Sequence, residues 1–148
     1  MRRIIMMAQK DDAYKHAMET FSMPPDNSIA SAITSAMKQM VKVLAQPSCI
    51  VTYTVSGKTT FRAARERVLV PILALTSDEH VANKLSLVWG VYPIVTEHVK
   101  DMTQVTPIAI QQAKEIGLAK SDDELIITAG IPFARQGSTN ILHIAKVD

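Results

Sequence analysis

The sequence of 148 residues predicts an α/β fold, a three-layer sandwich with a five-stranded, mainly parallel sheet and helices on both faces. Short apolar runs of strand length alternate with longer segments in which apolar residues recur every three or four positions. Strands that are separated by helices imply right-handed crossovers and parallel pairing. The last two apolar runs have no helix between them, so the last strand is expected to be antiparallel and to lie at an edge.

The N-terminal part is predicted to be helical. Residues 1–8 form a helix or its remnant, residues 11–21 are weakly helical, and the Pro-Pro-Asp-Asn break at 24–27 ends this segment and supplies an N-cap. The next helix is amphipathic and ends near Gln46 and Pro47. Its inward face is expected to consist of Ile29, Ile33, Met37, Met40, Val41 and Leu44. We therefore divide the chain into a helical lead-in, 1–27, and an α/β domain, 28–148.

From Cys49 onward, strands and helices alternate. The predicted strands are Cys49–Tyr53, Ile72–Leu75, Val91–Val95, Leu125–Ala129 and Ile141–Ala145. The first connecting helix is Lys58–Arg67. The second follows Thr76, which has the capping-box spacing to Glu79, and turns Val81, Leu85 and Val88 inward. The third is expected to start at Thr106-Pro107 and to end at Gly117.

Composition excludes several classes of protein. Sixteen Lys and Arg against fourteen Asp and Glu leave a net charge of +2, too small and too evenly spread for binding nucleic acid or an anionic membrane. No segment approaches the ~20 apolar residues of a membrane span. The single cysteine, Cys49, excludes an internal disulfide and is expected to be a buried hydrophobe. The short apolar start is broken at Gln9, so export is not expected and a cytoplasmic location is predicted.

The most informative motif is a hydroxyl-rich turn between the first strand and the following helix. Ser56, Thr59 and Thr60 offer hydroxyl donors, Gly57 lets the backbone approach an oxyanion, and Lys58 adds a charge. Together with Thr54 and the free N–H groups of a helix start, these residues describe an anion site.

A second loop repeats this chemistry after the fourth strand. It runs from Gly130 to Asn140 and includes Arg135, Gly137, Ser138 and Thr139. Both loops leave the carboxyl ends of strands, which is where ligands collect in open parallel sheets. The turn is not a Walker A loop, because position 52 is Thr instead of Gly. From the residues alone, a phosphate site and a merely well-capped helix both stay open.

Other candidate residues favour structural roles. The four histidines lack metal-ligand spacing, and Ser56 has no partners in a recognisable triad order. A solvated turn is the preferred interpretation of Asp122-Asp123-Glu124. Trp89 is expected to pack on the apolar side of its helix. The sequence thus predicts no metal site and no catalytic residue.

Five short motifs, taken in order, resemble the C-terminal domain of pyruvate kinase from about Ser28 to Lys146, and more weakly back to Met1. They are Thr-Val-Ser-Gly-Lys-Thr at 54–59, Ile-Leu-Ala-Leu-Thr at 72–76, Trp-Gly-Val-Tyr-Pro at 89–93, Ile-Thr-Ala-Gly-Ile-Pro at 127–132 and Gly-Ser-Thr-Asn at 137–140. The resemblance independently implies the same three-layer architecture.

The resemblance also implies a function. In many pyruvate kinases the loop matching 54–59 holds a phosphate of an allosteric sugar phosphate, and the loop matching 135–139 closes over it. Val55 stands where eukaryotic members often carry a basic residue. The segment 96–106 has no counterpart to the tryptophan and arginine that grip the other phosphate. These two departures leave open a phosphate pocket with a different effector, or with none. The candidate effectors are a sugar phosphate and a nucleoside monophosphate.

The catalytic barrel of that family has no counterpart here, since it needs about 250 residues. The resemblance implies a regulatory and subunit-assembly domain that self-associates and is inactive alone. Residues 1–27 would be the remnant of its junction with the barrel, and magnesium and potassium would be bound by the absent domains. Two alternatives stay open: a freestanding protein that binds a phosphorylated metabolite, and a small enzyme with its own site in the same crevice.

Overall fold

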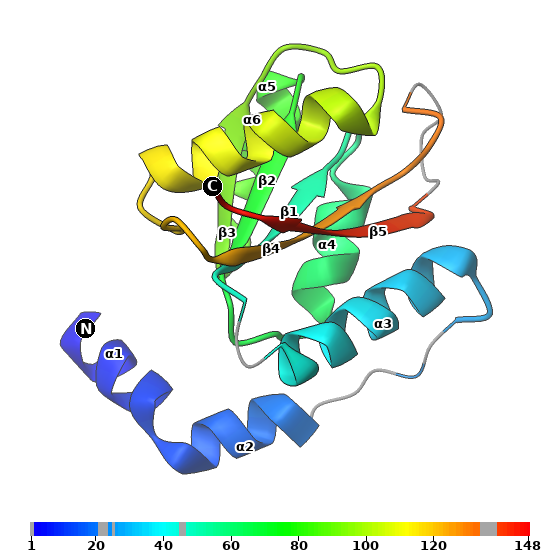
Figure 1. Ribbon diagram of the computed structural model, residues 1–148. Helices are drawn as coiled ribbons and strands as arrows, with labels where there is room; N and C mark the ends of the chain where they lie inside the picture. The colour runs from blue at the N-terminus through cyan, green and yellow to red at the C-terminus, as the bar shows by residue number, and fades with distance from the viewer. Residues whose placement is uncertain (1, 21–23, 25, 45–46, 134–138) are drawn as a thin grey trace.

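The computed structural model describes residues 2–20, 24, 26–44, 47–133 and 139–148, and it contains one five-stranded sheet (Figure 1). The strands are β1 (Cys49–Tyr53), β2 (Ile72–Thr76), β3 (Val91–Val95), β4 (Glu124–Ala129) and β5 (Ile141–Lys146). Their order is β3-β2-β1-β4-β5. All neighbours are parallel except β4 and β5, which are antiparallel. The predicted sheet is confirmed, with each strand within one residue of its expected bounds.

The central strand β1 has the burial that is expected in a mainly parallel sheet. All five of its residues are buried, as expected for a strand covered on both faces. Ile50 pairs with Ile72 on one side and with Ile126 on the other. Edge strand β5 alternates less strictly, with Ile144 exposed and Ala145 buried. Only one of its sides meets another described strand.

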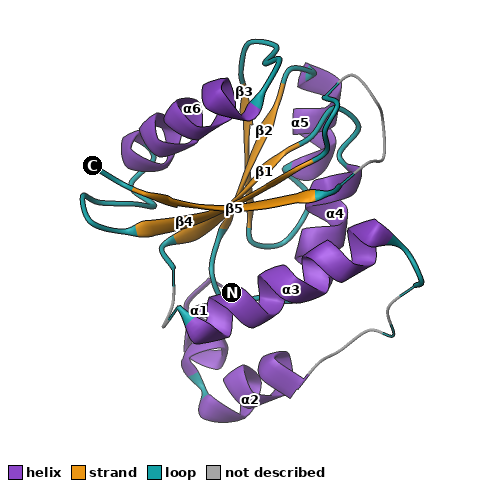
Figure 2. Cartoon of the chain, turned by 45° about the vertical axis from the view of Figure 1, so that its right-hand side comes forward, coloured by secondary structure: helices purple, strands orange, loops and turns teal. Residues whose placement is uncertain are grey.

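Helices cover both faces of the sheet and complete the three predicted layers (Figure 2). Helix α6 (Met102–Glu115) lies on one face and buries Val105, Ala109 and Ala113 against alternate residues of the strands. Helices α3 (Ile29–Val43), α4 (Lys58–Arg65) and α5 (Glu79–Leu85) lie on the other face. Each face therefore has its own apolar core.

The start of α3 differs from the expectation. Its N-cap is Ser28, whose hydroxyl accepts from the N–H of Ser31 at 3.1 Å, so the preceding Pro-Pro-Asp-Asn segment does not supply the cap. Ile29, expected on the inward face, is 71% exposed. It occupies the first helical position. Met37 and Val41 are buried as expected, and Ala30 and Thr34 complete the buried stripe. Thr34 is tolerated there because its hydroxyl bonds to the carbonyl of Ala30.

Two further predicted helix starts were wrong. Helix α5 is capped by Asp78, whose carboxylate accepts from the N–H groups of His80 and Val81, and the predicted cap residue Thr76 belongs to β2. Asp78 is two residues closer to these donors along the chain than Thr76. The capping-box pattern therefore misplaced the helix start by two residues.

Helix α6 begins at Met102 behind the cap residue Asp101, and Pro107 lies inside the helix. Pro107 is the sixth residue of the helix, past the first turn, so the helix lacks the bond that an N–H there would make to the carbonyl of Thr103. The Thr106-Pro107 pair was thus misread as a helix start. Helix α4 also ends two residues earlier than predicted, and Arg67 adopts a positive φ of 52° beyond it.

The N-terminal helices α1 (Arg2–Lys10) and α2 (Asp12–Thr20) lie outside the three layers, beyond α3 (Figure 1). They form a helical pair whose apolar side chains remain largely uncovered, and Ile4, Ile5, Met6 and Met7 are all exposed. Among the described residues, no helix is both long and apolar enough to cross a membrane.

Candidate functional site

The candidate site lies at the carboxyl end of β1, where the sheet changes direction. The chain leaves β1 through α4 toward β2 on one side, and β4 lies on the other side of β1. Ligands in open α/β sheets bind at such a switch point, beyond the carboxyl ends of the strands. The predicted turn 54–57 and the loop 130–140 both leave this edge. The topology therefore brings the starts of the two predicted segments to the same edge of the sheet.

The turn after β1 is held in shape by its own residues. The buried Thr54 hydroxyl accepts from the N–H of Gly57 at 2.9 Å and closes the turn. Gly57 has a φ of 82°, in the left-handed region that favours glycine. A Cβ at this position would lie 3.1 Å from Phe61 Cε2. The left-handed φ therefore favours glycine, and a side chain at this position would also force the Phe61 ring to shift.

The N-terminus of α4 is unlike those of the neighbouring helices. Side chains cap α3, α5 and α6, whereas the N-cap of α4 is Gly57, which has no side-chain acceptor. The first turn of a helix has N–H groups without partners in the helix. The first turn of α4 contains no acidic residue and carries Lys58, whose positive charge is repelled by the positive end of the helix dipole. An anion at this end would accept hydrogen bonds from the N–H groups. It would also offset the charge of Lys58 and the partial positive charge of the helix end.

The hydroxyl of Thr59 connects the turn to the second loop. Thr59 Oγ1 and Thr139 Oγ1 lie 2.8 Å apart and share a hydrogen bond. Both residues are buried, and they are separated by 80 positions in the chain. A hydroxyl pair uses one of its two hydrogens internally, so the other remains available to a bound anion. The structure therefore joins two of the predicted site residues directly.

The second loop is fastened at its base by Asn140. Its side-chain amide donates to the carbonyl of Ile131 at 2.7 Å and accepts from the N–H of Ile131 at 2.8 Å. The backbone N–H of Asn140 also bonds to the carbonyl of Ala129. These bonds fix where the loop leaves β4 and enters β5. The predicted site residues Arg135, Gly137 and Ser138 lie outside the described residues.

The remaining predicted site residues are placed differently from one another. Ser56 is half-buried and Lys58 is exposed at the mouth of the turn. Thr60 is fully buried, and its hydroxyl lies 2.7 Å from that of Thr52 in the core. Thr60 can thus offer its backbone N–H to an anion, while its hydroxyl serves the packing of α4 against β1.

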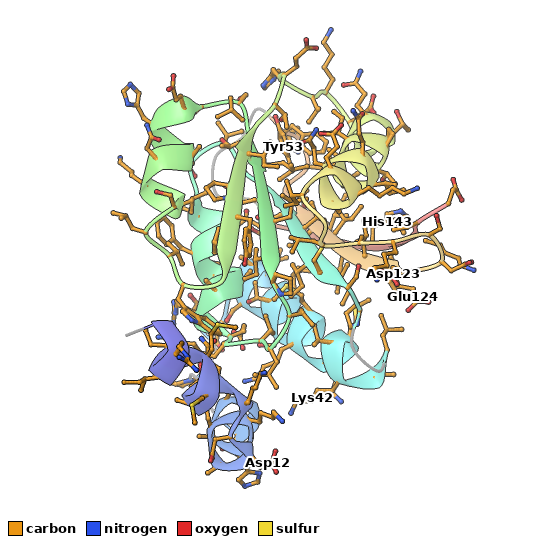
Figure 3. The ribbon with its side chains drawn as sticks, turned by 90° about the vertical axis from the view of Figure 1, so that its left-hand side faces the viewer. Asp12, Lys42, Tyr53, Asp123, Glu124 and His143 are labelled. Atoms are coloured by element: carbon orange, nitrogen blue, oxygen red, sulfur yellow. The ribbon has the colours of Figure 1, made fainter. Side chains whose placement is uncertain are left out.

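The sequence analysis gave no role at the site to Thr52 and Tyr53, and it named Asn140 only as part of a motif. The ring of Tyr53 meets that of Phe133 edge to face at a centroid distance of 5.2 Å. The Tyr53 hydroxyl accepts from the N–H of Val99 at 3.3 Å. Tyr53 therefore ties the second loop and the segment after β3 to the end of the central strand, which Figure 3 shows at one end of the molecule. Its position as the last residue of β1 was a signal that could have found it.

The basic residues of α4 face the segment before α3. Arg62 is half-buried, with its Nη1 atom enclosed and without a hydrogen-bond partner among the described residues, and Arg65 is exposed. The carboxyl pKa of Asp26 is lowered, first by the hydroxyl of Ser28 and further by Arg62 and Arg65. The basic side chains of α4 thus have an acidic neighbour in Asp26.

Several other residues have structural roles. His16, His80, His98 and His143 are all exposed, as expected. No three His, Cys, Asp or Glu side chains in the described part of the chain are grouped to hold a metal ion. In the acidic turn, Asp122 pairs with Lys146 at 2.9 Å and Asp123 accepts from the N–H of Lys120.

Cys49 and Trp89 complete this set. Cys49 is fully buried, as predicted, and burial raises the pKa of its thiol to about 12. Trp89 differs from the expectation. It is 43% exposed, and the guanidinium of Arg67 lies 5.9 Å from its ring centre. The indole follows the last turn of α5, where it stacks under a cation instead of packing in the core.

Comparison with known proteins identifies the family. The family model described as "Pyruvate kinase, alpha/beta domain" matches residues 31–145. A pyruvate kinase of Agrobacterium vitis is 36% identical over 147 residues, which are 99% of this chain and 30% of that relative. One of Geobacillus stearothermophilus is 41% identical over 117 residues, 77% of this chain and 20% of the relative. The chain thus spans less than a third of the length of these relatives.

A solved structure agrees in fold. The crystal structure of a pyruvate kinase from Cryptosporidium parvum superposes with a TM-score of 0.85 at 23% identity, and the match covers 99% of this chain and 28% of that one. Because the family model matches residues 31–145, which are most of this chain, the chain belongs to the pyruvate kinase alpha/beta domain family.

Proposed function

We propose that this chain is the regulatory and assembly domain of a pyruvate kinase, and that the turn Thr54–Thr60 binds the phosphate group of a small effector. The observation that carries the proposal is the start of α4. It has an N-cap without a side chain, a cation in its first turn and a hydroxyl shared with the second loop. A helix start with a purely structural role is stabilised by a side-chain cap and by acidic residues in the first turn, and α4 has neither.

The chemistry of the turn favours a phosphorylated metabolite over a free carboxylate. A phosphate presents three oxygens, which suit backbone N–H groups, the Ser56 and Thr59 hydroxyls and the Lys58 ammonium together. A sugar phosphate or a nucleoside monophosphate is the class that we propose. Its remaining part would lie toward the loop that ends at Thr139.

Calorimetric titration of the chain with inorganic phosphate, fructose bisphosphate, ribose phosphate, glucose phosphate and AMP tests this proposal. Saturable binding of at least one phosphorylated metabolite is expected. Ser56→Ala combined with Thr59→Ala is expected to weaken it about ten- to hundredfold, because two direct donors are lost. Lys58→Ala is expected to weaken it by less than about fivefold, because an exposed charge contributes little.

Two further variants frame this experiment. Gly57→Val is expected to abolish binding, since the left-handed φ and the 3.1 Å approach of Phe61 both exclude a side chain. Lys120→Ala, which removes an exposed cation outside the site, is the matched control for Lys58→Ala and is expected to bind as the parent does. If the parent chain binds none of the phosphate compounds, the turn is only the start of a helix and the proposal is refuted.

We assign phosphoryl transfer from phosphoenolpyruvate to ADP, and the magnesium and potassium ions that it uses, to the part of the relatives that this chain does not match. The relatives' additional length supports this assignment. We accordingly propose that the chain works within a cytoplasmic, glycolytic enzyme and has no pyruvate kinase activity alone. A coupled assay is expected to match the blank, and turnover that disappears on mutation of this chain would refute the assignment.

A further inference from the structure

Two segments that leave the carboxyl ends of strands are each held against the core by a single residue. In the segment after β3, Val99 is the only buried residue between positions 97 and 101. In the described start of the second loop, 130–133, the only buried residue is Phe133. Pulling either residue out of the core would expose its apolar surface to water. Val99 and Phe133 therefore fix where the two segments lie, and we call them the two anchors.

Both anchors contact the same side chain, that of Tyr53. The Tyr53 hydroxyl accepts from the N–H of Val99 at 3.3 Å. Its ring meets that of Phe133 at a centroid distance of 5.2 Å and an interplanar angle of 77°. Tyr53 is only 3% exposed, and it directly precedes Thr54, whose hydroxyl closes the turn after β1. One buried side chain thus holds both segments beside the turn.

The ring and the hydroxyl of Tyr53 have separable roles. An edge-to-face pair of aromatic rings is stabilised beyond the burial of its area, so the ring holds Phe133. The N–H of Val99 is buried, and a buried N–H without an acceptor is costly, so the hydroxyl holds Val99. Replacement by phenylalanine removes only the second contact, whereas replacement by leucine removes both.

The contact with Phe133 leads to the phosphate turn. Phe133 lies in the second loop, and Thr139 at the other end of this loop shares a hydrogen bond with Thr59 of the turn at 2.8 Å. A loop that is held at both ends has less conformational entropy to lose when its donors meet a ligand. Removing the ring of Tyr53 releases one of these two fixed points.

We propose that Tyr53 is a positioning residue of the phosphate site. Its ring holds Phe133 and thereby raises the affinity for a phosphate group, and its hydroxyl holds Val99 and the segment around it. Tyr53 acts through these neighbours and not by contact with the anion. The effect on affinity rests on the function proposed for the turn Thr54–Thr60, whereas the attachment of the two segments to Tyr53 does not.

Amide hydrogen exchange of the ligand-free chain, followed by NMR, tests the attachment. Tyr53→Phe is expected to speed exchange of the Val99 amide about tenfold and to leave the amides of Ile131 and Asn140, which hydrogen-bond across the base of the second loop, within about twofold. Tyr53→Leu is expected to speed all three about tenfold. Val51→Ala is the matched control, because Val51 lies two residues earlier on the same face of β1 and in the same core. It is expected to leave all three amides within about twofold.

Titration with inorganic phosphate and the four phosphorylated metabolites of the calorimetric series tests the effect on affinity. Tyr53→Leu is expected to weaken binding about five- to tenfold, whereas Tyr53→Phe and Val51→Ala are expected to stay within about twofold of the parent. Phe133→Leu is expected to weaken binding as much as Tyr53→Leu. The double variant is expected to bind no more weakly than either single one, because both remove the same contact. Circular dichroism of each variant verifies the fold.

The two experiments separate failure of this inference from failure of the proposed function. If the parent chain binds no phosphate compound, the proposed function is refuted, and with it the effect of Tyr53 on affinity, while the exchange rates still decide the attachment. Where the parent binds, an undiminished affinity of Tyr53→Leu, or an equal loss in Val51→Ala, would overturn the positioning role. Unchanged exchange of Val99 in Tyr53→Phe would overturn the role of the hydroxyl.

Discussion

At the scale of single residues, burial decides which side chains are chemically active. Cys49 is the first residue of β1 and Lys58 is the first residue of α4. The Cys49 side chain is fully buried, whereas Lys58 is exposed. The pKa of the Cys49 thiol is raised to about 12, mainly because burial disfavours the thiolate and to a smaller extent because Asp123 is nearby, against the opposing effect of Ser48. A thiol in this state is neither a nucleophile nor a redox sensor.

This pKa predicts a pH dependence of stability. The thiol has its ordinary pKa of 9.0 in the unfolded chain and binds its proton more tightly in the folded one. Its contribution is therefore complete below pH 9 and is lost as pH rises toward 12, with a slope of about 1.4 kcal/mol per pH unit. Urea unfolding between pH 8 and 10.5 measures the slope, with Cys49→Ala as the control because it lacks the titrating group. Identical slopes for the two chains would contradict this explanation.

At the scale of elements, the start of α4 differs from the starts of α3, α5 and α6. Three helices are closed by Ser28, Asp78 and Asp101, each of which accepts hydrogen bonds from the first turn. Helix α4 has no such cap and also has the shortest connection to the central strand. The difference places the chemically open helix end at the switch point of the sheet, and the closed ends elsewhere.

The observed cap of α5 gives a test at this scale. Asp78→Ala is expected to lower the free energy of unfolding by about 1 kcal/mol, because two N–H groups lose their acceptor. In a capping box Glu79 would contribute through its side chain, whereas here it is exposed without a described hydrogen bond to the cap. Glu79→Gln is therefore expected to stay within about 0.5 kcal/mol of the parent. Denaturant unfolding of both variants makes the comparison, and a larger loss from Glu79→Gln would favour the capping box.

The strands were predictable because apolar runs such as those around Val51 and Ile127 are buried on both faces and have no other stable place. Helix starts were less predictable, since Thr76 and Asp78 are both good caps and only the register of β2 decides between them. At the site, Thr59 and Thr139 could be named from the motifs. Their shared hydrogen bond, and the core position of the Thr60 hydroxyl, depend on how α4 packs on β1.

At the scale of the whole molecule, the sheet ends at β3 on one side and at β5 on the other, and the β5 edge is suited to association. Strand β5 pairs with β4 on one side, and Ile144 on it is 42% exposed (Figure 1). An uncovered edge offers unpaired backbone groups to another strand, and a two-fold contact needs only one self-complementary surface. Helix α3 is the helix that packs beside β5, whereas α4 packs on β1 and β2.

We predict that the chain self-associates through this edge. Light scattering at high micromolar concentration is expected to give a mass above that of the monomer. Ile144→Lys is expected to shift the equilibrium toward monomer by about tenfold or more, because a charge at an apolar contact must be desolvated. Val43→Lys, which changes a residue on α3 that is 71% exposed, is the control and is expected to associate as the parent does. A monomer at every concentration would count against the edge as an interface.

The hydrogen bond between Thr59 and Thr139 has a consequence for biosynthesis. The two hydroxyls are separated by 80 residues, so a ribosome that adds about 5–20 residues per second makes Thr139 roughly 4–16 s after Thr59. Throughout that interval the nascent chain has the turn but lacks its partner loop. The contact between Thr59 and Thr139 therefore forms only after translation has passed β4, and the phosphate site that we propose would be incomplete until then.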